Sequence, residues 1–287
     1  MAKRLGRLVV IRATPADRDA IMAFLLTRPT VAMFPITNLR DHGMEGGHTE
    51  AMSFWTAQTN GHITDILGIT DAGSVLPVFS TDQPRDIGAA LRDREITVIV
   101  GQAAPVAEVK AALGLPDGTL NRVEPHFELV LDEMKMPNTI GLSIVPVAAV
   151  PRAEIIVWRR QYGIDALDLS PESAAIQAID AVDRMIAQDT HRVLLAGGEP
   201  VAITGFNSIL PDAVMVGGVY TPKHLRGRGF ARAALALHLA EARNKGVKHA
   251  VLSAANAIAA KAYIAIGFQQ IGDFMIVLYD TPQTANV

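Results

Sequence analysis

The chain has 287 residues, of which 49% are hydrophobic and 19% are charged, and its formal net charge is −3. This length suffices for one large domain or two ordinary ones. The charge gives no electrostatic reason to expect nucleic acid or an anionic membrane as a partner. Because the chain has no cysteine, disulfides, thiolate zinc sites and a cysteine nucleophile are excluded.

No stretch of the sequence reaches the apolar length of a membrane span. The basic start, Met1 to Arg7, is followed by a short apolar run, Leu8 to Ile11, which Arg12 ends. A signal peptide needs a longer apolar core. We therefore expect a cytoplasmic protein without a membrane partner.

The first half of the chain has the pattern of a mixed α/β domain. Thr14 and Pro15 suit the N-cap and first position of a helix that Pro29 ends, and Asn60-Gly61 is a hairpin signal. Periodicity and breakers predict strands at 8–12, 52–58, 62–70, 75–79, 96–100 and 127–131, and helices at 14–25, 33–41, 86–94 and 105–113.

A domain boundary is predicted at 134–141, where Pro137, Asn138 and Gly141 separate two strand-like runs. The second half repeats a similar order, with strands at 142–147, 192–196, 201–207, 214–220, 250–253 and 271–278, and helices at 153–162, 170–189, 229–244 and 256–266. We therefore predict two α/β (α+β) domains, 1–138 and 139–287. Each is expected to have a mostly antiparallel mixed sheet flanked by helices.

One strand–loop–helix unit, residues 214–244, carries the clearest chemical signal. A valine-rich strand stops at Thr221-Pro222, and a basic loop with Gly227 and Gly229 precedes a long helix. Glycines let the backbone approach a ligand, and the helix N-terminus adds unpaired amides and a dipole. The pattern predicts a site for a diphosphate, where Arg226 and Arg228 add charge-assisted contacts.

The alternative for a bare Gly-x-Gly is a turn that merely connects a strand to a helix. Here the strand, the basic loop and the small-residue helix agree, which favours binding. Two other phosphate motifs fail: no Gly-x-x-x-x-Gly-Lys-Ser/Thr occurs, and Gly-x-Gly-x-x-Gly breaks at Arg232. The histidines show no metal-ligand spacing, so no metal is expected.

The run Arg226-Gly227-Arg228-Gly229-Phe230-Ala231 resembles the Arg/Gln-x-x-Gly-x-Gly/Ala signature of the GNAT N-acetyltransferase superfamily. A second run, 256–268, is similar to the family's Asn-x-x-Ala-x-x-x-Tyr-x-x-x-Gly-Phe element. The resemblance covers about 192–278. It implies transfer of an acetyl group from acetyl-CoA to the amine of a small molecule.

The resemblance also implies residue roles. The backbone of residues 219–221 would pair with the pantetheine arm like an added strand, and the amides of 227–232 would hold the pyrophosphate. Asn256 would contact the arm or the acetyl region, and Tyr263 would protonate the leaving thiolate. From the residues alone, Asn256 is equally a helix N-cap and Tyr263 a core aromatic. The residues expected to bind acetyl-CoA are Val219, Tyr220, Thr221, Arg226, Gly227, Arg228, Gly229, Phe230, Ala231, Arg232 and Asn256.

Many members of this family carry a glutamate as general base on the strand before the loop, but residues 214–220 contain no acid. Asp212, Glu199 and His224 do not match a family position. The base therefore stays unassigned, and proton removal through water is an alternative. A CoA-binding sensor without turnover is the second functional hypothesis.

The first half resembles the superfamily through Phe34-Pro35-Ile36-Thr37-Asn38-Leu39, but no Arg-x-x-Gly-x-Gly/Ala loop occurs before residue 139. We expect a degenerate GNAT-like domain without CoA binding, which either forms a wall of the acceptor site or serves packing. In the second half, Trp158, Arg159, Arg160 and Tyr162 predict either a stack on the CoA adenine or a helix face bordering the acceptor cleft.

Overall fold

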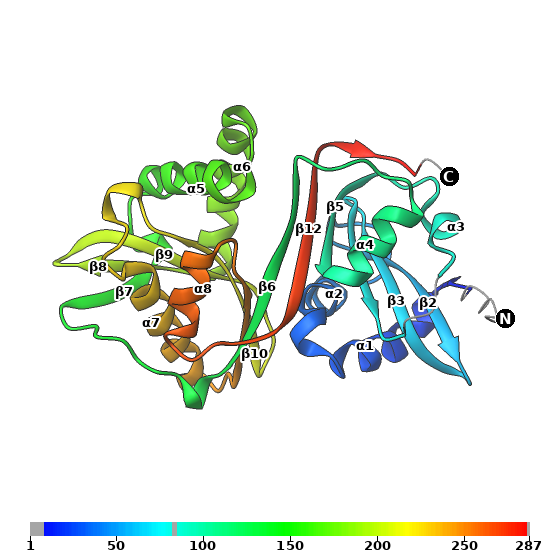
Figure 1. Ribbon diagram of the computed structural model, residues 1–287, viewed down its shortest axis with the longest axis horizontal. Helices are drawn as coiled ribbons and strands as arrows, with labels where there is room; N and C mark the ends of the chain where they lie inside the picture. Colours follow the sequence, from blue (N-terminus) through cyan, green and yellow to red (C-terminus); the bar gives the residue numbers. More distant parts are fainter. Residues whose placement is uncertain (1–8, 82–84, 286–287) are drawn as a thin grey trace. The chain divides into compact units, whose positions relative to one another are not determined.

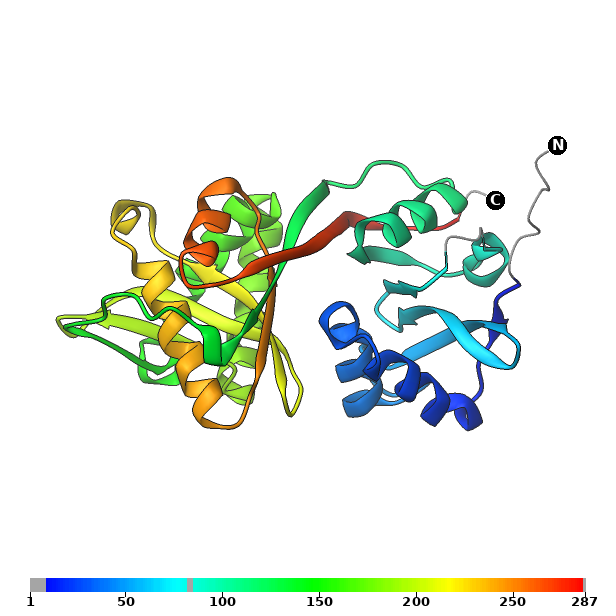
Figure 2. The ribbon, with the colours of Figure 1, turned by 60° about the horizontal axis from the view of Figure 1, so that its bottom comes forward.

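The computed structural model describes residues 9–81 and 85–285. The chain forms two compact units, shown in Figures 1 and 2: unit 1 consists of Met1–Val123 and Asp273–Val287, and unit 2 of Glu124–Gly272. Leu8, predicted to open the first strand, lies outside the described residues.

The sheet of unit 1 has the order β1-β2-β3-β4-β5-β12. Its pairs are antiparallel except for the parallel pair β4–β5. The strands are β1 (Ile11–Arg12), β2 (Met52–Thr59), β3 (His62–Thr70), β4 (Ser74–Phe79), β5 (Ile96–Gln102) and β12 (Gln269–Gln283). The helices are α1 (Arg18–Leu26), α2 (Pro29–His42), α3 (Ile87–Leu91) and α4 (Ala103–Ala112).

The start of the first helix differs from the expectation in detail. Thr14 donates two hydrogen bonds to the Asp17 carboxylate, from its amide at 2.8 Å and from its hydroxyl at 2.9 Å, but a 3₁₀ turn precedes α1. The first helix ends at Leu26, before Pro29, but the prediction that the next helix begins at 33 is wrong, because Pro29 is the first residue of α2. Proline suits the first position of a helix because the N–H of that position has no partner within the helix.

The sheet of unit 2 has the order β6-β11-β10-β9-β8-β7 and one parallel pair, β10–β11. Its strands are β6 (Leu120–Val130), β7 (Leu142–Pro146), β8 (His191–Ala196), β9 (Glu199–Ile209), β10 (Ala213–Tyr220) and β11 (His249–Ser253). Its helices are α5 (Arg152–Leu167), α6 (Pro171–Gln188), α7 (Phe230–Asn244) and α8 (Ala257–Ile264). The predicted mostly antiparallel mixed sheets with flanking helices are confirmed in both units.

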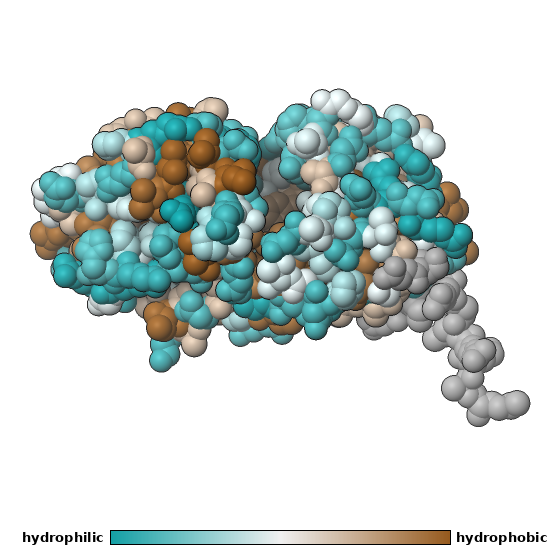
Figure 3. Space-filling view, turned by 90° about the horizontal axis from the view of Figure 1, so that it is seen from above, coloured by the Kyte–Doolittle hydropathy of each residue, from teal (hydrophilic) through white to brown (hydrophobic). Residues whose placement is uncertain are grey.

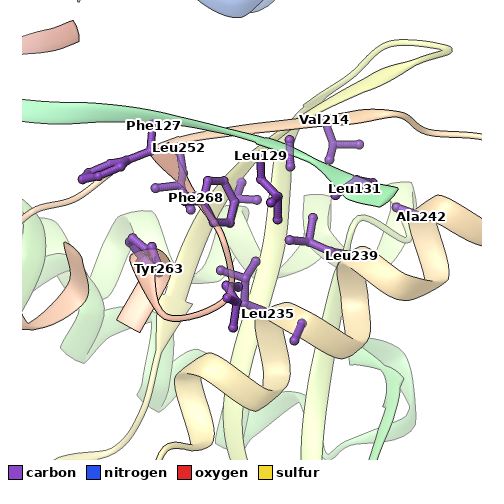
Figure 4. Packing of buried hydrophobic residues seen from close by; sticks show 14 of the residues in the cluster. Phe127, Leu129, Leu131, Val214, Leu235, Leu239, Ala242, Leu252, Tyr263 and Phe268 are labelled. Atoms are coloured by element: carbon purple, nitrogen blue, oxygen red, sulfur yellow. The ribbon is translucent and has the colours of Figure 1, made fainter. Parts of the chain in front are cut away.

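Two hydrophobic clusters fix the helices of unit 2 on its sheet. On one face, Leu235 and Leu239 of α7 are buried with Phe127 and Leu252 of the strands, as Figure 4 shows. On the other face, the buried side chains of α5 and α6 lie with those of β8, β9 and β10; they include Ile155, Trp158, Val182, Val193, Ile203 and Tyr220. The sheet is therefore covered on both sides.

The solvent side of α5 and α6 is partly apolar. Val157, Ile176 and Ile179 are exposed there. On the face of the protein seen in Figure 3, hydrophobic side chains reach the surface in several groups among hydrophilic ones.

The two units repeat one order of elements. Each has a strand, two helices, three strands, a helix, a strand and a helix, from β1 to α4 in unit 1 and from β7 to α8 in unit 2. This is the repetition that the sequence pattern indicates.

The division into units falls at other residues than 138/139. β6 begins at Leu120 rather than at 127, and its residues from His126 to Val130 pair with β11 of unit 2. β12 extends to Gln283 and pairs with β5 of unit 1 from Phe274 onward. An apolar pattern predicts a strand but not the strand with which it pairs. A boundary drawn from turn residues therefore misses that β6 pairs within unit 2 and β12 within unit 1.

Candidate active site

Strand β10 pairs with its parallel neighbour β11 over only the first part of its length. Its register with β11 covers Ala213 to Met215, and against β9 it is interrupted between Met215 and Val216 and between Gly217 and Tyr220. Beyond Met215 the backbone of β10 is therefore open on the β11 side over its described register. An extended ligand can pair with such a strand edge.

Glycines shape the irregular part of β10. A Cβ at Gly217 would lie 2.1 Å from Nδ2 of Asn207, and one at Gly205 of β9 would lie 2.1 Å from Nε2 of His191. Gly218 has a φ of +63°, and a Cβ there would lie 3.2 Å from the same His191 nitrogen. The side chains of Asn207 and His191 thus occupy the space that larger residues would need.

The loop after β10 has the backbone that the sequence predicts. Gly227 and Gly229 both have a φ of +80°, a region that favours glycine, and a Cβ at Gly227 would meet nothing within 4 Å. Gly229 is the N-cap of α7, whose first hydrogen bond runs from the Ala233 amide to the Gly229 carbonyl at 3.0 Å. The amides of Phe230, Ala231 and Arg232 precede that bond, which leaves a helix N-terminus suited to an anion.

Arg226 holds this loop rather than pointing freely toward a ligand. Its Nε donates to the Thr221 carbonyl at 3.0 Å and its Nη2 to the Asp165 carboxylate of α5 at 2.9 Å. Lys223 pairs with the same carboxylate at 3.1 Å. Burial raises the pKa of Asp165, but hydrogen bonds from Gln161, Arg226 and Lys223 outweigh it and hold the pKa below its ordinary value. The carboxylate therefore stays charged and ties the loop to α5.

Thr221 stands where β10 leads into this loop. Its side chain is buried, and its Oγ1 has no hydrogen-bond partner among the described residues. A buried hydroxyl without a partner is uncommon and is consistent with a bound ligand that supplies one.

Asn256 caps helix α8. Its Oδ1 accepts hydrogen bonds from the Ile258 amide at 3.1 Å and the Ala259 amide at 2.9 Å. The N-cap interpretation is therefore realised, and a ligand contact by this exposed residue stays a prediction.

Tyr263 of α8 lies at the edge of the unit 2 core (Figure 4), with its ring centroid 6.1 Å from that of Phe268. Burial raises the pKa of its phenol, and Tyr162 of α5 and Glu124 of β6 raise it further. The phenol therefore keeps its proton at neutral pH.

Two buried residues of β6 were missed by the sequence analysis. Glu124 and His126 are 4% and 2% exposed. His126 is paired in register with Ser253 of β11, and its Nδ1 lies 3.1 Å from the Ser253 hydroxyl. The alternation Glu124-x-His126-x-Glu128 is the only signal that marks them, because the strand was predicted to begin at 127.

The other acid and base candidates lie elsewhere. Glu199 is exposed at the β8–β9 hairpin, and His224 is exposed in the loop after β10. Asp212 receives the Lys248 and His249 amides on its backbone carbonyl at 2.8 and 2.9 Å. None of the three replaces the missing acid of β10.

The described part of the chain contains neither a candidate metal site nor a candidate membrane span. No group of three or more His, Asp or Glu side chains within residues 9–81 and 85–285 could hold a metal ion. No helix in these ranges is long and apolar enough to cross a membrane.

Part of unit 2 is similar to a known protein family. Residues 158–268 match the model of the acetyltransferase (GNAT) family. No curated protein matches the chain.

Solved structures extend the likeness over most of the chain. A Drosophila protein has a TM-score of 0.62 at 13% identity, covering 94% of this chain and 98% of its own. A GCN5-related N-acetyltransferase from Sphaerobacter thermophilus has 0.57 at 14%, covering 95% of each chain. A tandem GNAT protein from the clavulanic acid biosynthesis pathway has 0.53 at 15%, covering 94% and 98%. At such low identities, the structural likeness shows a shared fold alone.

Proposed function

We propose that the chain is a tandem GNAT-superfamily protein and that its unit 2 transfers an acetyl group from acetyl-CoA to the amine of a small molecule. The observation that carries this proposal is the left-handed glycine loop at the open end of α7, directly after a strand that has left its parallel neighbour. These features offer an anion site and an adjacent strand edge in one unit.

The residues fit acetyl-CoA as follows. The amides from Gly227 to Arg232 hold the pyrophosphate at the helix N-terminus, and the backbone of Val219, Tyr220 and Thr221 pairs with the pantetheine arm. The buried Thr221 hydroxyl, without a protein partner among the described residues, gains one from the ligand. Asn256 caps α8, which carries Tyr263. The acyl end of acetyl-CoA is proposed to lie at these two residues.

The reaction needs an acid for the leaving sulfur. The amine nitrogen attacks the thioester carbonyl carbon, the C–N bond forms, the C–S bond breaks, and the nitrogen loses one proton. Tyr263 donates its phenolic proton toward the thiolate and recovers one from solvent. Its raised pKa keeps that proton in place until charge develops on the sulfur, which has an ordinary thiol pKa of about 8.5.

Unit 1 is proposed not to bind CoA. The segment after β4 contains no glycine before α3, whereas the corresponding loop in unit 2 contains two. Pro77 of β4 also lacks the N–H that an added strand would use. Titration of the full chain with acetyl-CoA should therefore give one site per chain, and a stoichiometry of two would contradict the assignment.

The alternative is a CoA-binding sensor without turnover, which the absence of an acid on β10 favours. Release of free thiol from acetyl-CoA in the presence of a panel of small amines separates the two. Amine-dependent release is expected. Tight acetyl-CoA binding with no release for any amine would favour the sensor.

A further inference from the structure

Arg159 lies on the inner side of α5, the helix that covers one face of the unit 2 sheet. It stands four residues after Ile155 and three before Tyr162, a spacing that places these side chains on one side of the helix. Ile155 is fully buried, and Arg159 is half-buried. The Arg159 guanidinium carbon lies 4.8 Å from the centroid of the Tyr162 ring. The side chain is thus held against the ring.

Arg159 differs from Arg152 in its charge partners. Within residues 9–81 and 85–285, no Asp or Glu oxygen comes within ion-pair distance of it, whereas Arg152 of the same helix pairs with Asp183 at 2.7 Å. Burial lowers the pKa of Arg159; Tyr162 raises it, and Arg184 of α6 lowers it again. A partly desolvated cation beside another cation is unfavourable without a counter-charge.

The position of Arg159 relates it to the proposed acyl-transfer site. Tyr162, on which it stacks, is also the residue of α5 that acts on the Tyr263 phenol. Burial lowers the pKa of His191 to about 3, and Arg159 and Arg192 contribute to this shift. His191 is therefore neutral, and it lies against Gly218 of β10. Tyr162 also packs against the buried cluster that includes Tyr220 of β10, so the Arg159–Tyr162 pair lies on the α5 side of that strand.

We propose that Arg159 binds an anionic group of the acceptor, so that the substrate is an amine that also carries a carboxylate or a phosphate. This inference rests on the proposed acyl transfer in unit 2. A guanidinium stacked on a ring keeps its edge N–H groups, and these match the paired oxygens of either anion. The anion supplies a counter-charge that no carboxylate of the described residues provides, and the amine is held near Tyr263.

The phosphates of CoA are assigned to the C-terminal end of α5, beyond Arg159. Asp165, which carries Arg226 and Lys223 of the glycine loop, stands six residues beyond Arg159. Six residues of helix span about 9 Å. Arg159 thus serves the anion of the acceptor, whereas Arg226 and Lys223 belong to the loop that holds the CoA phosphates.

The test uses matched ligands and the full chain in excess CoA. Calorimetry compares L-tyrosine with tyramine, L-histidine with histamine and L-lysine with cadaverine for the carboxylate, and 2-aminoethyl phosphate with ethanolamine for the phosphate. We expect one or more anionic members to bind roughly 10- to 100-fold more tightly than the matched amine, since hydrogen bonds to charged groups are gained. The set in which the preference occurs identifies the anion.

The preference should disappear in Arg159→Gln. It should survive in Arg160→Gln, which removes the same charge from an exposed neighbouring position. If Arg159→Gln does not fold, Arg159→Lys decides, and the preference should then fall severalfold because the paired geometry is lost. No preference in any pair, or one that folded Arg159 variants retain, would overturn the proposal.

Thiol release with the same ligands separates this inference from the proposed function. Anion preference without turnover of any ligand would remove the acyltransferase and leave the Arg159 site. Turnover of the plain amines with no anion preference would support the acyltransferase and remove the Arg159 site.

Discussion

Replacement of Gly229 by aspartate tests the proposed pyrophosphate site most directly. The residue caps α7 with a φ of +80°, and a Cβ there would meet only Nη2 of Arg232, at 3.6 Å. The new side chain therefore has room, but it places a carboxylate where the proposal places a diphosphate.

The expected stability change is small because two effects oppose each other. A left-handed backbone costs a non-glycine residue about 1–2 kcal/mol. A carboxylate at a helix N-terminus regains about 0.3–1 kcal/mol. A net loss of about 1 kcal/mol leaves the unit folded.

The expected loss of affinity is larger. A carboxylate about 5 Å from one phosphate charge is repelled by about 1 kcal/mol in water and by about 3 kcal/mol at the effective dielectric of a protein surface. Binding of acetyl-CoA should therefore weaken by roughly 5- to 150-fold.

Calorimetry on the full chain measures this loss, and Gly141→Asp is the matched control. Gly141 is exposed, has a φ of +74° and has no atom within 4 Å of a built Cβ, so the backbone cost is similar. If folded Gly229→Asp binds acetyl-CoA as tightly as Gly141→Asp does, the loop does not hold the diphosphate and the reasoning is refuted.

Three further changes test other parts of the site and of unit 2. Tyr263→Phe should lower turnover by roughly 10²–10⁴-fold and stability by about 1 kcal/mol while leaving acetyl-CoA affinity unchanged; weaker binding at unchanged turnover would make it a binding residue. Asp165→Asn should weaken acetyl-CoA binding severalfold because Arg226 and Lys223 lose their shared partner, whereas Asp183→Asn, which breaks the exposed pair with Arg152, should leave it unchanged; equal effects would contradict the role of Asp165. Burial lowers the pKa of His191 and His238 to about 3, so the unfolded state binds more protons below its own pKa of about 6.5, and stability is present above that pH and falls toward pH 3. At pH 5 each histidine should lower the free energy of unfolding, measured with urea, by about 2 kcal/mol relative to neutral pH. His238→Phe keeps a ring against Phe206 and should remove about half of this decrease. The same decrease in the variant would contradict the role of His238.

Local chemistry made much of unit 2 predictable from the sequence. The glycine loop, the Asn256 cap and the start of α6 at Pro171, with its Ser170 cap, depend on residues a few positions apart. Their backbone geometry follows from glycine, proline and side-chain acceptors.

Long-range pairing could not be predicted in the same way. Arg226 was expected at the phosphates, but its carboxylate partner lies 61 residues away on α5. Glu124 and His126 enter unit 2 only because β6 pairs with β11, and no local pattern names that partner. The sequence left two interpretations of Arg159 open, and the absence of an ion pair to it within residues 9–81 and 85–285 favours the one at the acceptor cleft.

The division of the chain has a consequence for the order of folding during synthesis. Unit 2 is one continuous segment of 149 residues, Glu124–Gly272, inserted into unit 1. Its sheet can be completed as soon as that segment has left the ribosome. Unit 1 must wait for β12, whose pairing with β5 closes a loop that contains all of unit 2. The usual order, in which the N-terminal domain folds first, is therefore reversed, and loss of residues after 272 should unfold the N-terminal sheet before the C-terminal one.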